Sequence, residues 1–408
     1  MAMKKRQPAV LLGGACVLAL AACASSGGGN SGGSAAPKTI TICNVTELSG
    51  VQQPLAKTES AGGVVAADII NAAGGIKSLG GAKLVVKKFD TQSNPDMGAP
   101  EATKAVSAGC KAIWGGEITD TVLAATAVTH RAHIPWVDVG GIGDQVHRRG
   151  FNDVFQLTTT TGIANSYYSM LKYADSSLGI TDPTVGLSVS DTSYGQGFYA
   201  AWSILNKNGP FNVVSNVSYP LSTSDLSSIA SRMASKTPAI LFNMGYPADG
   251  IALGRLFKQT FHTNAKAFFS TAQSQVAMSQ LGSLANGQMF SASSPPTSSP
   301  QLDKFNQVYQ SKIGSAPSIE AWQGYTAVMF IAAALQKAAS TDGPAIASAL
   351  HGVSLTAANG NVFPDTLSFA SDGSPTHQPY YWQQDQNGKL VYVYPPSLKQ
   401  ASVMPYGS

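Results

Sequence analysis

Residues 39–89 read TITICNVTELSGVQQPLAKTESAGGVVAADIINAAGGIKSLGGAKLVVKKF. This stretch predicts a strand at 39–45, a helix at 54–73 and a second strand at 83–89. Two glycines follow the helix directly, where a left-handed residue ends many helices. Strand, helix and strand in this order form a βαβ unit, which places the two strands parallel in one sheet.

The same alternation continues along most of the chain. Further β-rich runs lie at 112–114, 134–139, 154–157, 184–189, 211–217, 239–243 and 265–269, with helical stretches between them. Repeated βα units indicate an α/β protein with mostly parallel, doubly wound sheets. Two series of similar size, before and after residue 152, predict two similar lobes. A Ser/Pro-rich linker at 291–300 then precedes two helices, at 301–312 and 319–339, and a β-rich tail.

Length and composition exclude several classes of protein. The chain has 408 residues, with 26 Lys and Arg against 22 Asp and Glu. That length favours two domains. No long Lys/Arg run follows residue 6, which argues against a nucleic-acid partner, because such proteins carry a clustered basic face. Four cysteines without a C-x-x-C pair exclude a zinc ribbon or a thioredoxin-like site as the first hypothesis, and no metal site or cofactor is predicted.

The first residues are typical of an export signal. Lys4, Lys5 and Arg6 precede an apolar stretch at 9–22 that is too short to span a bilayer. The signal peptide is predicted at 1–22. Leu20-Ala21-Ala22-Cys23 resembles the bacterial lipobox, which implies that Cys23 is lipidated and that 23–37 forms a flexible Gly/Ser tether. Ordinary cleavage after Ala22, with Cys23 incidental, is the alternative.

Several motifs occur in one order along the mature chain. They are ELSG at 47–50, ADIINAAGGI at 67–76, FDTQSNPD at 89–96, SDTSYGQG at 190–197 and FASDG at 369–373. In this order and spacing the chain resembles the branched-chain amino acid and amide class of periplasmic-type ABC transporter receptors, over about residues 38–395.

The resemblance implies the type I periplasmic binding protein fold, with two Rossmann-like lobes that close around a small ligand. Three hinge crossings are expected near Leu157, Ser293 and Asn361. The expected first lobe is 38–157 plus 294–360, and the expected second lobe is 158–293 plus 361–408. Strand carboxyl ends then face the cleft, which is the usual ligand site of open α/β sheets.

Two loops of the first lobe are candidate ligand contacts. Thr119, Asp120 and Thr121 follow a strand and begin a helix, where hydroxyls and unpaired N–H groups favour a carboxylate. These residues are also suited to cap their own helix. Asp120 departs from the serine that the family commonly has, and its charge would repel a bound carboxylate. Gly140, Gly141 and Ile142 follow the next strand, and glycines let a ligand approach the backbone closely.

The second lobe offers aromatic contacts but no carboxylate. By the resemblance, Tyr194 and Tyr246 lie at cleft positions, although either tyrosine would also suit a core. Amino-acid binders of this family hold the ammonium group with an acid after the strand 265–269, and this chain has Gln273 in that region. Glu320 either replaces that acid or is an exposed residue at a helix start. A polar ligand that is not a zwitterion therefore competes with leucine-like ligands.

Two cysteines remain in the predicted domain. Cys43 lies in the first strand and Cys110 precedes the third, and such strands are neighbours in a doubly wound sheet. An oxidising compartment permits a disulfide between them. Two buried free thiols are equally compatible with the sequence.

The sequence is therefore interpreted as the lipid-anchored solute-binding component of an ABC importer, on the extracytoplasmic face of a bacterial membrane. Its expected ligand is a branched-chain amino acid, an amide or a related carboxylate. Its expected partner is a membrane permease, and the receptor is expected to be a monomer. A sensory receptor for urea, an amide or an aromatic acid is the alternative. An extracytoplasmic amidase or esterase is the enzyme alternative, and no base for its nucleophile is evident.

Overall fold

The computed structural model describes residues 37–221, 223–292, 298–363, 365–378 and 380–407. The predicted signal peptide and the lipidation site Cys23 lie outside these residues. The described chain is an α/β protein built on two mainly parallel sheets, which confirms the expected fold class. None of the described helices combines the length and the hydropathy that a membrane crossing requires.

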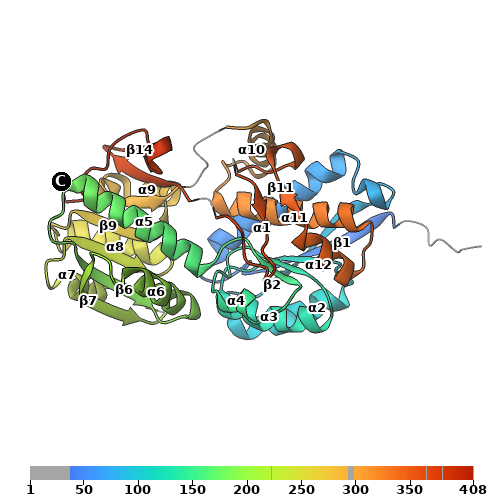
Figure 1. Cartoon of the computed structure of the whole chain (residues 1–408), viewed down its shortest axis with the longest axis horizontal. Helices are drawn as coiled ribbons and strands as arrows, with labels where there is room; N and C mark the ends of the chain where they lie inside the picture. The colour runs from blue at the N-terminus through green and yellow to red at the C-terminus, as the bar shows by residue number, and fades with distance from the viewer. Residues whose placement is uncertain (1–36, 222, 293–297, 364, 379, 408) are drawn as a thin grey trace, which may run out of the picture. The chain divides into compact units, whose positions relative to one another are not determined.

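The first sheet is entirely parallel, with the strand order β2-β1-β3-β4-β5. Its strands are β1 (Thr39–Thr46), β2 (Lys83–Asp90), β3 (Ile113–Gly115), β4 (Trp136–Asp138) and β5 (Val154–Gln156). The helices around it are α1 (Gln53–Ala72), α2 (Gly98–Ser107), α3 (Thr119–Arg131), α4 (Gln145–Arg148), α10 (Pro300–Ile313), α11 (Ile319–Ala338) and α12 (Gly343–His351). We call this sheet with these helices the first lobe (Figure 1).

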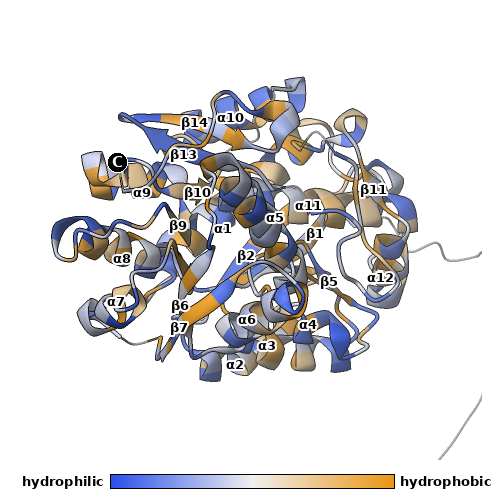
Figure 2. Ribbon diagram, turned by 60° about the vertical axis from the view of Figure 1, so that its left-hand side comes forward, coloured by the Kyte–Doolittle hydropathy of each residue, from blue (hydrophilic) through white to orange (hydrophobic). Residues whose placement is uncertain are grey.

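Both faces of the first sheet are buried, so its strands are almost continuously apolar. Ile40 and Ile42 of β1 point to one face and pack in the same core as α1 and α11. Cys43 and Val45 point to the other face, where α2 and α3 cover them. Figure 2 shows hydrophobic residues in orange along the strands and helices, interspersed with hydrophilic residues in blue.

The second sheet has the order β14-β13-β10-β9-β8-β6-β7. Its strands are β6 (Thr184–Ser190), β7 (Asn212–Tyr219), β8 (Ile240–Met244), β9 (Ala267–Gln273), β10 (Met289–Ser291), β13 (Trp382–Gln386) and β14 (Lys389–Tyr394). The helices α5 (Thr160–Leu178), α6 (Ser193–Asn206), α7 (Ser227–Ala234), α8 (Pro247–Gln259) and α9 (Ser274–Leu281) surround it. We call this sheet with α5–α9 the second lobe. The strands β13 and β14 are antiparallel additions from the end of the chain.

Smaller elements complete the described chain. β11 (Ser354–Leu355) and β12 (Leu367–Ser368) form a short antiparallel pair. Single 3₁₀ turns lie at Lys77–Leu79, Pro95–Met97, Gly282–Ala285, Ala357–Asn359 and Pro396–Leu398. The sequence patterns did not predict α9, β10 or α12. β10 is only three residues long, so it shows no periodicity, and α9 and α12 are short helices of eight and nine residues.

The last part of the first lobe extends further along the chain than expected. Val362, Leu367 and Phe369 are buried in the same core as β1. The Gln156 backbone N–H donates to the Gly373 carbonyl at 2.9 Å, which ties this segment to β5. The expected third crossing near Asn361 therefore falls inside the packing of the first lobe. The expected crossing near Ser293 lies outside the described residues.

Cys43 and Cys110 are buried in the first lobe, with their Cα atoms 5.7 Å apart, and they form a disulfide. The bond joins β1 to the residue that closes the turn after α2. The sequence was compatible with either a disulfide or two free thiols, and the structure has the disulfide.

Helices α1 and α11 cross with almost no space between their backbones. A Cβ atom on Gly62 of α1 would lie 1.9 Å from the Ala321 carbonyl oxygen. A Cβ atom on Gly324 of α11 would lie 2.0 Å from the Glu59 carbonyl oxygen. Only glycine allows this approach, because any side chain would push the helices apart. The crossing fixes where the first turn of α11 lies in the first lobe.

We predict that Gly324→Ala lowers the free energy of unfolding by roughly 1–3 kcal/mol, the usual cost of overpacking a core. Urea denaturation followed by circular dichroism measures this change. Gly197→Ala in α6 is the matched control, because its added Cβ meets no atom closer than 3.5 Å and alanine favours the helix. Equal stability of the two variants would contradict the close crossing.

Candidate functional site

A cavity of about 190 Å³ lies between the carboxyl ends of the two parallel sheets. Its wall comes from the loops after β3, β4, β5, β6, β8 and β9 and from the start of α11. The lining residues include Gln52, Leu55, Glu117, Val139, Gly140, Ile142, Leu157, Thr158, Tyr167, Tyr194, Tyr246, Thr271, Gln273, Ser291, Glu320, Gln323, Thr326, Phe330, His377, Tyr380 and Tyr381. This position is where open α/β sheets bind ligands.

Six of the residues predicted from the sequence line the cavity. They are Gly140, Ile142, Tyr194, Tyr246, Gln273 and Glu320. Each follows a strand of one of the sheets or, for Glu320, begins α11. The two lobes therefore contribute facing walls to one site.

The remaining predicted residues lie behind or beside the wall. The Thr119 hydroxyl oxygen accepts the Gly143 backbone N–H at 3.0 Å, and Thr121 is buried. The Gly141 N–H donates to the Asp138 carboxylate at 2.9 Å. Among the described residues of the wall, neither threonine nor Gly141 appears. The two threonines stand in the first turn of α3 with buried side chains, and Gly141 lies in the loop after β4, so these residues shape the loops rather than face the cavity.

Asp120 joins the two lobes. Its Oδ1 accepts a hydrogen bond of 2.5 Å from the Ser193 hydroxyl, which stands in the first turn of α6. Asp120 is outside the cavity wall as far as the described residues show. The side chain that was expected to contact a ligand thus forms a hydrogen bond between α3 and α6.

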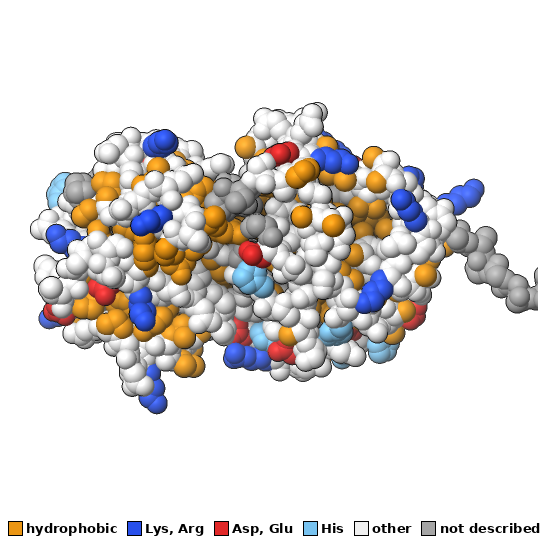
Figure 3. Space-filling view, turned by 45° about the horizontal axis from the view of Figure 1, so that its top comes forward, with side chains coloured by type: hydrophobic (Ala, Val, Ile, Leu, Met, Phe, Trp, Pro, Cys, Tyr) orange, Lys and Arg blue, Asp and Glu red, His pale blue; other side chains and the backbone are white. Residues whose placement is uncertain are grey.

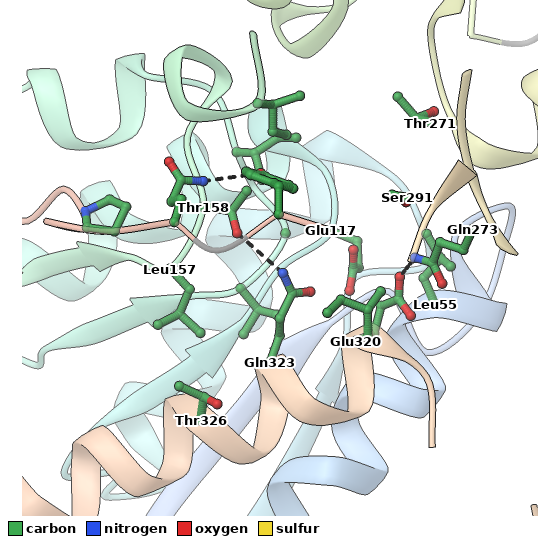
Figure 4. Close-up of a pocket in the computed structure, with 18 of the residues that line it drawn as sticks. Leu55, Glu117, Leu157, Thr158, Thr271, Gln273, Ser291, Glu320, Gln323 and Thr326 are labelled. Atoms are coloured by element: carbon green, nitrogen blue, oxygen red, sulfur yellow. Dashed lines mark hydrogen bonds between the residues drawn. The ribbon is translucent and has the colours of Figure 1, made fainter. Parts of the chain in front are cut away.

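Glu320 is buried rather than exposed at its helix start, with 3% of its surface accessible. Gln273 of the second lobe donates to Glu320 Oε1, and the Ser318 hydroxyl donates to Oε2 at 2.7 Å. Burial raises the pKa of Glu320 from 4.5 to about 7, against the opposing effect of the hydrogen bonds from Ser318 and from its own backbone N–H. Figure 4 shows the pair that Gln273 and Glu320 form across the cavity.

Glu117 is the main residue that the sequence reasoning missed. It follows β3 directly and points into the cavity (Figure 4). Its Oε1 is buried and has no hydrogen-bond partner among the described residues. Burial, and then repulsion from Glu59 and Glu320, raise the pKa of Glu117 well above its usual range. Its place between Gly116 and Ile118, directly after a strand, was the available signal.

Further carboxyl groups lie behind Glu117. Glu47 Oε2 accepts the Glu117 backbone N–H at 2.8 Å. The Thr46 hydroxyl lies 2.7 Å from Glu59 Oε2 and 3.2 Å from Glu47 Oε2. Burial raises the pKa of Glu59 to about 8, with repulsion from Glu47 adding to it. Burial likewise raises the pKa of Asp138 to about 8. Within the described residues, no group of three or more acidic, His or Cys side chains is arranged to hold a metal ion.

Aromatic side chains form much of the opposite wall. Tyr194 and Tyr246 meet edge to face, with ring centroids 5.3 Å apart, and each is 6% exposed. The Tyr167 hydroxyl donates to the Ser270 carbonyl at 2.9 Å. Tyr167 comes from the middle of α5, where a core position and a cleft position have the same sequence pattern, so it was not predicted.

The buried carboxyl groups predict a dependence of stability on pH. A group whose pKa is higher in the folded chain stabilises it at low pH, and this contribution is lost as the pH rises through the folded pKa. With Glu59 at about 8 and Glu320 at about 7, the ligand-free protein should melt at a higher temperature at pH 5 than at pH 8. Differential scanning calorimetry measures this difference.

Glu59→Gln should reduce that difference, because it removes a group that must ionise while buried. Asp182→Asn, an exposed position in the turn before β6, is the control and should leave the difference unchanged. A melting temperature that rises from pH 5 to pH 8 would contradict the raised pKa values.

Comparison with known proteins agrees with this architecture. A protein of Brucella abortus (strain 2308), the Leu/Ile/Val-binding protein homolog 8, is 27% identical over 384 residues, which cover 88% of this chain and 92% of that protein. The family model described as periplasmic binding protein matches residues 39–389.

Two solved structures share the fold. The branched-chain amino acid transporter substrate-binding protein LivJ of Streptococcus pneumoniae, in complex with isoleucine, has a TM-score of 0.72 at 20% identity, covering 90% of this chain and 100% of that one. An ABC transporter solute-binding protein of Rhodopseudomonas palustris, in complex with 3,4-dihydroxybenzoic acid, has a TM-score of 0.71 at 19% identity. The match covers 87% of this chain and 95% of that one.

The family match spans both sheets, the cavity between them and the returning helix α11. The chain therefore belongs to the periplasmic binding protein family.

Proposed function

We propose that this protein is the extracytoplasmic solute-binding component of an ABC importer, which binds a small polar organic ligand and does not alter it chemically. The observation that carries the proposal is the cavity whose two walls come from different lobes. A molecule held there contacts both sheets, so its binding favours the closed arrangement. Among the solved structures that share the fold, one holds isoleucine, one holds Leu and one holds 3,4-dihydroxybenzoic acid.

The proposed lobes follow the expected division with one change. The first comprises 38–157 and 294 to about 373, and the second comprises 158–293 and the remainder. The burial of Phe369 beside β1 and the bond from Gln156 to Gly373 support the later third crossing. In this division Thr158 and Gln378 belong to connecting segments at the edge of the cavity.

The proposed ligand contacts are Gly140, Ile142, Tyr194, Tyr246, Gln273 and Glu320, together with Glu117. Thr119, Thr121 and Gly141 are proposed to support the loops behind them. Asp120 is proposed to hold the lobes together.

The proposed location rests on the first residues of the chain. Lipidation of Cys23 after removal of 1–22 would leave a tether of 23–37 before the folded part, and the receptor would act as a monomer beside its permease. Lys and Arg side chains are dispersed over the face drawn in Figure 3, which suits a partner other than nucleic acid.

A thermal-shift panel of amino acids, amides, urea and aromatic acids tests the function. A true ligand at 100 times its Kd should add roughly 2.7 kcal/mol of stability. Tyr246→Ala should abolish the shift, because it removes a cavity wall. Tyr199→Ala, on α6 but outside the described cavity wall, should retain it. The proposal would be contradicted if no compound of the panel raised the melting temperature and the protein hydrolysed one of them. That outcome would support the amidase alternative.

The bond between Ser193 and Asp120 predicts a measurable change in closure. Ser193→Ala removes a hydrogen bond worth about 1 kcal/mol, which shifts the balance towards open forms by about fivefold. The radius of gyration of the ligand-free protein in small-angle X-ray scattering should increase. Ser235→Ala, which removes only a bond to the nearby Arg232 carbonyl, should leave it unchanged. Identical scattering of both variants would show that the bond does not hold the lobes.

A further inference from the structure

The described lining of the cavity has acidic side chains without basic Lys or Arg partners. Two glutamates line it, Glu117 and Glu320, and its described lining residues include no Lys or Arg. We propose that the ligand carries a cationic nitrogen, such as an ammonium, amidinium or guanidinium group, on an apolar or aromatic body, and carries no carboxylate. This inference rests on the proposed solute-binding function and specifies the class of its ligand.

The two glutamates share one region of the cavity. Glu117 comes from the loop after β3 and Glu320 from the first turn of α11, and both belong to the first lobe. Figure 4 shows their carboxyl groups near each other, and repulsion between them contributes to the pKa of Glu117. Burial raises the pKa of both. A cation placed between two such groups supplies the countercharge that the wall lacks.

Two buried acceptor atoms in the wall are unpaired. Gln273 is 6% exposed, and its Nε2 donates to Glu320 while its Oε1 has no partner among the described residues. Oε1 of Glu117 is also buried and also lacks a hydrogen-bond partner among the described residues. Buried polar atoms are nearly always hydrogen-bonded, so these acceptors require a donor. An ammonium or amidinium group provides several N–H donors and no acceptor.

Three backbone donors in the loops after β3 and β4 are already occupied. The Glu117 backbone N–H donates to the Glu47 carboxylate, and the Gly141 N–H donates to the Asp138 carboxylate. The Gly143 backbone N–H is occupied in turn, because it donates to the Thr119 hydroxyl oxygen. Oxygen atoms of the protein thus occupy three backbone donors that an anionic ligand would need, and a carboxylate ligand would be repelled by Glu117 or Glu320 in the ionised form.

The rest of the wall suits an organic cation. Tyr194, Tyr246 and Phe330 line the cavity, and aromatic faces attract cations through their quadrupole. Leu55 and Leu157 add apolar surface (Figure 4). His377 also lines the cavity, and its Nε2 lies 3.3 Å from Asp365 Oδ2.

The test compares three probes of one shape and different charge. Isothermal titration calorimetry of the purified protein would use benzamidine, benzamide and benzoate, which differ only in the polar group, together with n-butylamine and L-leucine. Benzamidine should bind at least tenfold more tightly than benzamide, and benzoate should not bind. Glu117→Gln and Glu320→Gln should each reduce the affinity for benzamidine by at least tenfold. Asp225→Asn, an exposed acid of the second lobe, is the control and should bind like the unaltered protein.

The outcomes separate this inference from the function on which it rests. Benzamide, benzoate or leucine binding as tightly as benzamidine would overturn the cationic ligand and leave the solute-binding function intact. Failure of both benzamidine and n-butylamine would also overturn the cationic ligand. The cationic ligand would also be ruled out if a ligand found in the thermal-shift panel bound the Glu117→Gln variant as tightly as the unaltered protein. If no compound of either panel binds, the solute-binding function itself fails. Circular dichroism of each variant shows whether it folds.

Discussion

The close crossing of α1 and α11 is the constraint on which the rest of the structure depends. Glycine at positions 62 and 324 lets the two backbones approach until the carbonyl groups of Glu59 and Ala321 leave no room for a side chain. This contact brings a segment from beyond residue 300 back to the first sheet. It also sets the first turn of α11, so that Glu320 points into the cavity instead of into solvent.

The electrostatics of the site follow from that placement. Glu59 on α1 and Glu320 on α11 are brought close to Glu117 and Glu47, which stand at the ends of β3 and β1. Burial makes each ionised carboxylate costly, and their mutual repulsion adds to the cost. Hydrogen bonds from Thr46, Asn44 and Ser318 offset part of this cost. Because so many carboxyl groups lie around one cavity, its electrostatics favour a cationic ligand.

Prediction from the sequence was most accurate where local signals are strong. Most strands and helices of both series were predicted with small differences at their ends, because βα alternation and helix stops are local properties, whereas the short elements α4, α9 and β10 were not predicted. Gly140, Ile142, Tyr194 and Tyr246 line the cavity because they follow strands of the two sheets whose carboxyl ends face it. Thr119 and Thr121 also follow a strand, yet the turn of α3 directs them inward, and no sequence pattern reports that direction.

The sequence by itself determined the α/β class, the order of the βα units and the separation into two series, since these depend on periodicity and turn residues. It also carried the family resemblance that the family match later bore out. Only the tertiary structure decided which acids face one another. Glu117 and Glu320 are about two hundred residues apart, and their proximity depends on how closely two helices pack. Burial and charge coupling are properties of that packing, so they have no counterpart in the linear sequence.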